Sequence, residues 1–363
     1  MRGKFTLLAL ATVVALTAAA CAEEPDEPDA GPTEEETTLP GADMLACQVT
    51  DTGGIDDRSF NQTAYAGMER AESELGVEID FLESQSQADY EPNIQAFIDR
   101  GCDIIVTVGF LLGDATQAAA EANPEQPFAI VDFAYDPPLD NVLGLVFSTK
   151  EAAFLAGYAS ASWTKTGTMG TYGGINIGPP VTDFMDGFFA GAMYYNEQNG
   201  TEVEVLGWDP SNPDAGLFTG DFENQDAGRR VTEDLIAEGA DVILPVAGPV
   251  GLGTAAAVED SDQEDVMVGV DTDWCVSAEE SCPVVLTSVQ KNMDVAVFDS
   301  VAAVVEGTFE GGLYVGTLEN EGVGLTGFNE YEDQISDEVK ADLEEIRAGI
   351  IDGSISVNGE DYL

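Results

Sequence analysis

Short apolar runs without polar alternation recur along the chain, and segments of helical spacing separate them. Examples are MLACQVT at 44–50, IIVTV at 104–108 and VILPV at 242–246. The helical spacing after the first run is carried by Phe60, Ala64, Met68, Ala71 and Leu75. Apolar strands that alternate with helices are typical of a parallel sheet with both faces covered. The pattern therefore predicts an α/β fold.

One strand, helix, strand unit occurs twice, at 98–132 and at 236–271, with an offset of 138 to 139 residues. In each copy a glycine ends a helix, an apolar strand follows, and a Gly-containing turn leads into an Ala-rich helix. Each copy closes with a second apolar strand that ends in an aspartate, Asp132 or Asp271. One long sheet would not explain this recurrence in the same order, so the duplication predicts two lobes of similar construction.

The opening strand is duplicated as well, because residues 44–67 align with residues 169–191. Phe60 of the first copy matches Phe184 of the second, and each ring lies near the first turn of its helix. Both copies run strand, loop and helix, as the two lobes require.

At 363 residues the chain exceeds the usual size of one hydrophobic core. We expect an N-terminal lobe of residues 44–148 plus about 272–310, and a C-terminal lobe of 149–271 plus about 311–363. Ligands of open α/β sheets bind beyond the carboxyl ends of the strands. Two such edges that face each other would enclose a cleft.

Polar and aromatic residues gather at the predicted strand ends. The candidates are Asp51, Phe60, Asn61, Asp132, Phe184, Gly248, Gly251, Gly253 and Asp271. Two rings related by the duplication would face each other across the cleft and suit a flat ligand, although core packing explains each ring taken alone. A phosphorylated ligand is disfavoured because several carboxylates would face it, so we expect a polar, mostly neutral ligand.

The loop at 51–62, DTGGIDDRSFNQ, follows the first strand and opens the first helix. Its DTGG turn would let the backbone approach a ligand closely, and Ser59 with Gln62 predicts a capping box. Lys291 follows the apolar strand VVLTSV, and we expect it to donate to sugar hydroxyls beside Asp271. A salt bridge to a neighbouring acid, such as Asp294, is the alternative for Lys291.

The composition excludes several classes of function. Only 12 Lys and Arg stand against 69 Asp and Glu, so a nucleic-acid partner is excluded for lack of clustered cations. The acid excess fits a surface hydrated in a salty medium, or a protein that is simply acidic. Histidine is absent, which removes imidazole bases and His-ligated metals, and no cofactor is expected. The acidic segment 209–226 lacks the ligand spacing of a calcium loop, and we interpret it as a surface loop.

The first 21 residues have the pattern of an export signal. A cationic start, a short apolar core and the small residues before Cys21 resemble a bacterial lipobox, in which the cysteine is lipidated. Residues 22–43 are rich in Pro and acids, and we interpret them as a disordered acidic tether. We therefore expect a protein anchored by lipid to the extracytoplasmic face of the cell membrane. The alternative is an ordinary cleaved signal with a coincidental cysteine.

Four further cysteines lie in an exported chain, where disulfides form. Cys275 and Cys282 could close a small loop, and Cys47 could pair with Cys102 if their strands are neighbours. Spacing alone leaves the pairing open. A CxxC motif is absent, which argues against zinc binding and thiol redox chemistry.

Seven segments appear in one order over residues 44–331. They are DTGGIDDRSFNQ, RGCDIIVTVGF, PFAIVD, DFMDGFFAG, EGADVILPVAG, VGVDTD and TSVQKNMD. Together they resemble the basic membrane protein (PnrA-like) family of solute-binding lipoproteins, which are purine-nucleoside receptors of ABC importers. The resemblance implies a type I periplasmic-binding-protein fold, with two Rossmann-like lobes joined by a hinge and a ligand cleft between them. It also implies a binding protein without enzymatic activity, a monomer that delivers its nucleoside to ABC permease subunits.

The resemblance assigns roles to the candidate residues. Phe60 and Phe184 would cover the two faces of the base, with Phe188 and Phe189 as alternatives for the second ring. The remaining positions are Asp51, Asn61 and Asp132 at polar edges of the ligand, Gly248 where backbone approaches it, and Asp271 with Lys291 at the ribose hydroxyls.

Two other functions remain open from sequence. An extracellular hydrolase or nucleosidase could use Asp51, Asp56 and Asp57 as a metal or acid-base cluster. A binding protein for another small polar solute, such as a sugar or an autoinducer, would share the fold.

Overall fold

The structure, a computed structural model, describes residues 39–363. The predicted signal peptide at 1–21, with its lipobox Cys21, and most of the predicted tether lie outside the described residues. Residues 39–43, the end of the predicted tether, form a turn against the first helix. There the Gly41 backbone N–H donates to the carbonyl of Leu75 at 2.8 Å.

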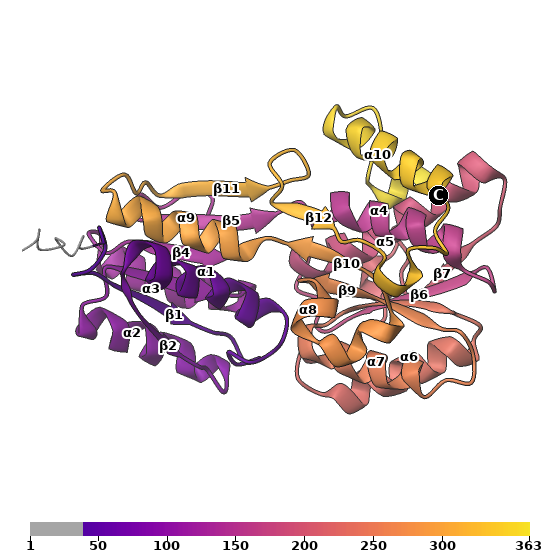
Figure 1. The fold of residues 1–363 in the computed structure, drawn as a ribbon. Helices are drawn as coiled ribbons and strands as arrows, with labels where there is room; N and C mark the ends of the chain where they lie inside the picture. Colours follow the sequence, from indigo (N-terminus) through magenta and orange to yellow (C-terminus); the bar gives the residue numbers. More distant parts are fainter. Residues whose placement is uncertain (1–38) are drawn as a thin grey trace, which may run out of the picture. The chain divides into compact units, whose positions relative to one another are not determined.

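The described chain contains twelve β-strands in two sheets (Figure 1). The strands are β1 (Leu45–Val49), β2 (Glu78–Leu82), β3 (Ile104–Val108), β4 (Phe128–Val131), β5 (Val142–Phe147), β6 (Thr168–Gly173), β7 (Glu204–Leu206), β8 (Val242–Val246), β9 (Val266–Asp271), β10 (Val285–Lys291), β11 (Gly312–Gly316) and β12 (Val323–Leu325). The first sheet has the order β11-β5-β4-β3-β1-β2, and all its pairs are parallel. The second has the order β12-β10-β9-β8-β6-β7, and only β12 is antiparallel to its neighbour.

Helices cover both faces of each sheet, as the apolar strands require. The helices are α1 (Phe60–Leu75), α2 (Tyr90–Arg100), α3 (Gly113–Ala122), α4 (Thr149–Trp163), α5 (Pro179–Asn199), α6 (Gln225–Ala237), α7 (Gly251–Glu259), α8 (Trp274–Ser277), α9 (Met293–Val305) and α10 (Asp337–Ile351). In the first lobe α1 and α9 share one core with the sheet, and α2 and α3 share another on its opposite face. In the second lobe α4 and α5 form the larger core, while α6 and α7 lie beside each other under β8 and β9 (Figure 1). The α/β class with two lobes is confirmed.

Two glycines matched by the duplication each lie where two helices pack closely, one in each lobe. A Cβ on Gly67 of α1 would lie 2.4 Å from the carbonyl oxygen of Asp294 on α9. A Cβ on Gly191 of α5 would lie 2.0 Å from the carbonyl oxygen of Phe154 on α4. Each glycine therefore lets a second helix approach closely.

The chain crosses between the sheets three times. The crossings are Ser148 between β5 and α4, Asn292 between β10 and α9, and residues 317–322 between β11 and β12. The expected placement of 272–310 in the N-terminal lobe is wrong for β10, which pairs with β9 in the second sheet. The expected placement of 311–363 in the C-terminal lobe is wrong for β11, which pairs with β5. An apolar strand pattern shows that a strand is buried but carries no information about which sheet it joins.

Two disulfides settle the cysteine pairing that the spacing left open. Cys47 of β1 bonds Cys102, which lies just before the neighbouring strand β3. Cys275 bonds Cys282 and closes the short loop after β9.

Candidate functional site

A cavity lies where strands of both sheets end, with about 620 Å³ of empty space when its open mouth is included. All eight residues predicted to bind ligand line it, namely Asp51, Phe60, Asn61, Asp132, Phe184, Gly248, Asp271 and Lys291. The structure therefore brings these eight residues together, whereas the further candidates Gly251 and Gly253 lie outside the lining.

The two duplicated aspartates end equivalent strands in the same unusual backbone conformation. Asp132 follows β4 with a φ of 66°, and Asp271 ends β9 with a φ of 69°. Residues other than glycine are uncommon at positive φ, and the conformation costs free energy that the surrounding structure must offset. Its presence at both strand ends indicates a local geometry kept in both copies.

Lys291 is buried at the centre of the cavity, with 1% of its surface exposed. Its Nζ lies 2.6 Å from Asp132 Oδ2 and 3.8 Å from Asp271 Oδ1. Lys291 therefore forms a salt bridge, as the alternative expected, but its partner is Asp132 and not Asp294. Burial raises the pKa of Asp132 to about 6, against the opposing effect of the Lys291 charge.

Phe60 and Phe184 approach the cavity from the two lobes. The Lys291 Nζ lies 4.7 Å from the Phe60 ring centroid and 5.9 Å from the Phe184 centroid, so both rings flank one ammonium group. Of the alternative rings, Phe188 is fully buried against α4, and Phe189 packs on the same core. Neither alternative lines the cavity, which favours Phe184 as the second ring.

A hydrogen-bonded cluster forms the polar wall of the first lobe. The Asn61 amide donates to Asp51 Oδ1 at 2.7 Å and to Asp57 Oδ2 at 3.1 Å. Burial raises the pKa of Asp51. The Asn61 Oδ1 atom is buried and accepts no hydrogen bond from the described residues. A buried acceptor without a donor is costly, which makes this oxygen a candidate ligand contact.

Asp57, rather than Ser59, caps α1. Its carboxylate accepts the backbone N–H groups of Ser59, Asn61 and Gln62 at 2.8 to 3.1 Å. Burial raises the pKa of Asp57 to about 6. The predicted capping box of Ser59 and Gln62 is therefore wrong, because the nearby carboxylate is the stronger acceptor for the free N–H groups. The Ser59 hydroxyl instead donates to Asp271 Oδ2 at 3.1 Å, from one lobe to the other.

The glycines serve two different purposes. Gly248 lines the cavity with a φ of 53°, which a residue with a Cβ rarely adopts. The other two glycine candidates serve packing: a Cβ on Gly251 would meet the Trp274 ring at 2.8 Å, and one on Gly253 would meet the Gln225 carbonyl oxygen at 1.9 Å. Only Gly248 among the three lines the cavity.

Gly109 and Phe222 are among the lining residues that sequence reasoning missed. Gly109 matches Gly248 at the duplication offset and has a φ of 120°, and a Cβ there would lie 2.8 Å from Asp51 Oδ2. The offset could have identified it. Phe222 also lines the cavity, although we interpreted 209–226 as a surface loop. An aromatic residue in an otherwise acidic loop was the only signal for Phe222, and the path of the loop could not be read from sequence.

The described residues, 39–363, contain neither a group of side chains suited to a metal ion nor a helix suited to span a membrane. In this range no three or more acidic, cysteine or histidine side chains are placed to hold a metal ion. Nor does any helix of this range have the length and apolar character needed to cross a membrane. Of the three acids in the hydrolase alternative, Asp51 and Asp57 line the cavity and Asp56 does not.

Comparisons with known proteins agree on one family. The model of the family described as "ABC transporter substrate-binding protein PnrA-like" matches residues 45–361. The CD4+ T-cell-stimulating antigen of Listeria innocua is 31% identical over 98% of this chain and 99% of its own length. Basic membrane protein A of Borreliella burgdorferi is 31% identical over 89% of this chain and 91% of its own. An uncharacterized lipoprotein of Pyrococcus abyssi is 33% identical over 76% of this chain and 67% of its own.

Solved structures show the same relationship. A solute-binding protein of an ABC transporter system from Aeropyrum pernix is 30% identical, with a TM-score of 0.78 over 86% of this chain and 92% of that one. A second such protein, from Conexibacter woesei, is 20% identical with a TM-score of 0.65 over 86% and 98%, and supports the fold alone. With a family match over nearly all described residues and this fold, the chain belongs to the PnrA-like family of ABC transporter substrate-binding proteins.

Proposed function

We propose that this protein captures a purine nucleoside in the cavity between its lobes and delivers it to an ABC permease. The observation that carries the proposal is the convergence of Phe60 and Phe184 on the same enclosed space as Asp132 and Asp271. Paired aromatic faces favour a planar heterocycle, and the strand-end carboxylates favour a ligand rich in N–H and O–H donors. A nucleoside has both features.

Each end of the ligand has matching partners. The base would lie between the two rings, with its polar edge towards Asp51 and the free Oδ1 of Asn61, where donors on the base would complete the buried cluster. The ribose would lie near Asp271 and Lys291, which offer an acceptor and a donor for hydroxyl groups. Asp132, held by Lys291, is near enough to exchange part of that ion pair for a ligand contact.

The charge of the cavity supports a nucleoside over a nucleotide. Four carboxylates line the space, from Asp51, Asp57, Asp132 and Asp271, and Lys291 is the one cation among the lining residues. Lys291 is already paired with Asp132. The net negative charge of the lining would therefore repel a phosphate group, and no unpaired cation among the lining residues would offset the repulsion.

Contacts between the lobes support capture by closure. Ser59 donates to Asp271, Lys291 pairs with Asp132, and Arg58 pairs with Glu280. A ligand that bonds both lobes would add to these contacts and shift an open population towards the closed one, the form for the permease to recognise. We propose a monomer that binds without catalysis, anchored through Cys21 on the extracytoplasmic face of the membrane.

Titration calorimetry on the purified, ligand-stripped protein tests the proposal. Inosine, guanosine and adenosine are compared with ribose, inositol and inosine monophosphate, and chromatography after incubation checks for free base. We expect binding of at least one nucleoside, none of the monophosphate, and recovery of intact nucleoside. Binding of the sugars alone would contradict the proposal in favour of another polar solute, and released base would contradict it in favour of a hydrolase.

A further inference from the structure

The third crossing between the sheets, residues 317–322, differs from the other two. Ser148 and Asn292 each pass between the lobes as a single residue, whereas this crossing makes a tight turn. Within the turn the Gly322 N–H donates to the Thr317 carbonyl at 2.9 Å. The Asn292 N–H donates to the Gly322 carbonyl at 2.9 Å, which ties two crossings together.

Leu318 is the point at which this crossing is held. Its N–H donates to Glu151 Oε2 at 2.8 Å, and its carbonyl accepts from Arg347 Nη2 at 2.7 Å. Its side chain is 1% exposed and belongs to the core of the second lobe. Both side chains that hold Leu318 come from that lobe, Glu151 from the first turn of α4 and Arg347 from α10. Hydrogen bonds with one charged partner are stronger than neutral ones, so the backbone of Leu318 is fixed on both sides.

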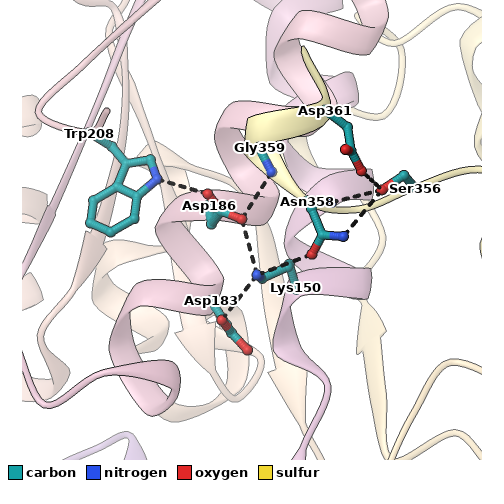
Figure 2. A network of polar contacts seen from close by, with 8 residues as sticks. All are labelled: Lys150, Asp183, Asp186, Trp208, Ser356, Asn358, Gly359 and Asp361. Carbon is teal, nitrogen blue, oxygen red and sulfur yellow. Dashed lines mark hydrogen bonds and ion pairs between the residues drawn. The ribbon is translucent and has the colours of Figure 1, made fainter. Parts of the chain in front are cut away.

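The first turn of α4 is itself immobilised, as Figure 2 shows for Lys150. Lys150 Nζ lies 3.4 Å from Asp183 Oδ1 and 3.1 Å from Asp186 Oδ2, both on α5. Asp186 also accepts the Trp208 indole N–H at 3.1 Å and the Gly359 N–H at 3.0 Å (Figure 2). Glu151, next to Lys150 in sequence, therefore extends from a turn that is joined to α5 and to the C-terminal segment.

Arg347 is a conspicuous residue in this chain. Acids outnumber bases 69 to 12, yet within residues 39–363 Arg347 forms no ion pair and instead donates to a backbone carbonyl. A groove of half-open space, lined by Asn292, Glu321 and Arg347 among others, runs beside the crossing. Leu318 and Glu321 of the crossing line this groove, and Leu318 is held there by its hydrogen bonds to Glu151 and Arg347.

We propose that Glu151 and Arg347 are positioning residues that clamp the third crossing to the second lobe at Leu318, so that the backbone of Leu318 does not bend when the lobes open. The clamp makes Leu318 part of one rigid body, and the bending falls on Ser148, on Asn292 and on the residues that flank Leu318, at 316–317 and 319–322. Without these two side chains the backbone at Leu318 can move relative to the second lobe, and the two lobes sample a wider range of separations. The inference rests on opening and closing of the lobes, not on the identity of the solute.

Interlobe distances measured by pulsed electron spin resonance test the clamp. Labels are placed at two exposed positions, Glu91→Cys on α2 and Asp234→Cys on α6, in the intact protein without solute. Arg347→Met and Glu151→Ala should each broaden the distance distribution, and the double variant should broaden it no further than the larger single effect. Glu151→Gln keeps an acceptor for the Leu318 N–H and should restore a narrow distribution, as should Arg347→Lys in part. Arg230→Met, which removes a charge from α6, is the matched control.

Thermal melting and release kinetics complete the test. If both clamp variants lower the melting temperature but keep the native distance distribution, the residues are merely structural and the inference is overturned. The same follows if Arg230→Met broadens the distribution equally. With inosine as probe, the clamp variants should release it about fivefold faster, within the usual range of coupling effects. Failure of inosine, guanosine and adenosine alike to bind would count against the proposed function and leave the distance result to decide on the clamp.

Discussion

The two lobes share a plan but contribute differently to the cavity. Asp132 and Asp271 end equivalent strands with nearly the same φ, yet Asp132 bonds Lys291 while Asp271 accepts from Ser59 of the opposite lobe. Lys291 ends β10, outside the duplicated units, whereas Ser59 lies in the loop of the duplicated segment 44–67. Duplication therefore explains where the two acids lie, but not which partner each of them bonds.

The loops before α1 and α5 show the same contrast. The first is polar, with the Asp57 carboxylate bonded to three backbone N–H groups. The second leads through Gly178 into Pro179 without a side-chain cap, and Ile177, Pro180 and Val181 line the cavity. The first lobe thus supplies most of the polar wall and the second most of the apolar wall. We expect the hydrogen-bonding edge of the base to face the first lobe.

The largest expected effect comes from removing the one cation that joins the duplicated acids. Lys291→Met leaves Asp132 and Asp271 buried without a positive partner, which should lower the free energy of unfolding by about 3 to 5 kcal/mol. Urea denaturation measures it. Adding Asp132→Asn should recover part of the loss, because it removes one uncompensated charge. If Lys291→Met alone changed the free energy of unfolding by less than about 1 kcal/mol, the assignment of a buried ion pair would be contradicted.

The free energy of unfolding should depend on pH through the carboxyl group of Asp132. Its pKa is raised from 3.8 in the unfolded chain to about 6 by burial, so the folded state binds the proton more tightly. The free energy of unfolding should therefore rise as pH falls from about 6 to about 4, by up to about 3 kcal/mol from this group. Urea denaturation of the native protein and Asp132→Asn across this range isolates the effect. Identical pH dependence in both would show that Asp132 does not titrate in this window.

The paired rings should matter equally if the duplication is functional. Phe60→Ala and Phe184→Ala should each weaken nucleoside binding by about 2 kcal/mol or more, because each loses one stacking face. Titration calorimetry gives the affinities, and Phe189→Ala, a ring outside the cavity lining, is the control. A large loss for one ring with none for the other would show that the two lobes do not share the base.

The smallest effect concerns two of the helix caps that have side-chain acceptors, those of α1 and α6. Asp57→Ala removes three bonds from backbone N–H groups at α1 and should lower the free energy of unfolding by about 1 to 2 kcal/mol. Asn224→Ala removes one bond at α6, from the Ala227 N–H, and should cost less. The difference between the two is measured by thermal denaturation. A larger loss for Asn224→Ala would contradict the role of Asp57 as the main cap of the first lobe.

Sequence alone could identify the α/β class, the duplication and eight of the residues that line the cavity, because apolar strands and strand-end acids leave local signals. It could not assign β10 and β11 to their sheets, since a strand pattern does not specify pairing partners. It could not choose Asp57 over Ser59 as the cap, because the choice depends on how Arg58, with a φ of 58°, turns the loop. The path that brings Phe222 to the cavity is likewise set by tertiary packing.

A crystal structure of the protein with its bound nucleoside is the most direct test of the central claim. We predict a purine ring between Phe60 and Phe184, with ribose hydroxyls within hydrogen-bonding distance of Asp271 and Lys291. A nucleoside bound outside the space enclosed by the two rings, or in contact with one lobe only while the lobes are closed, would contradict it.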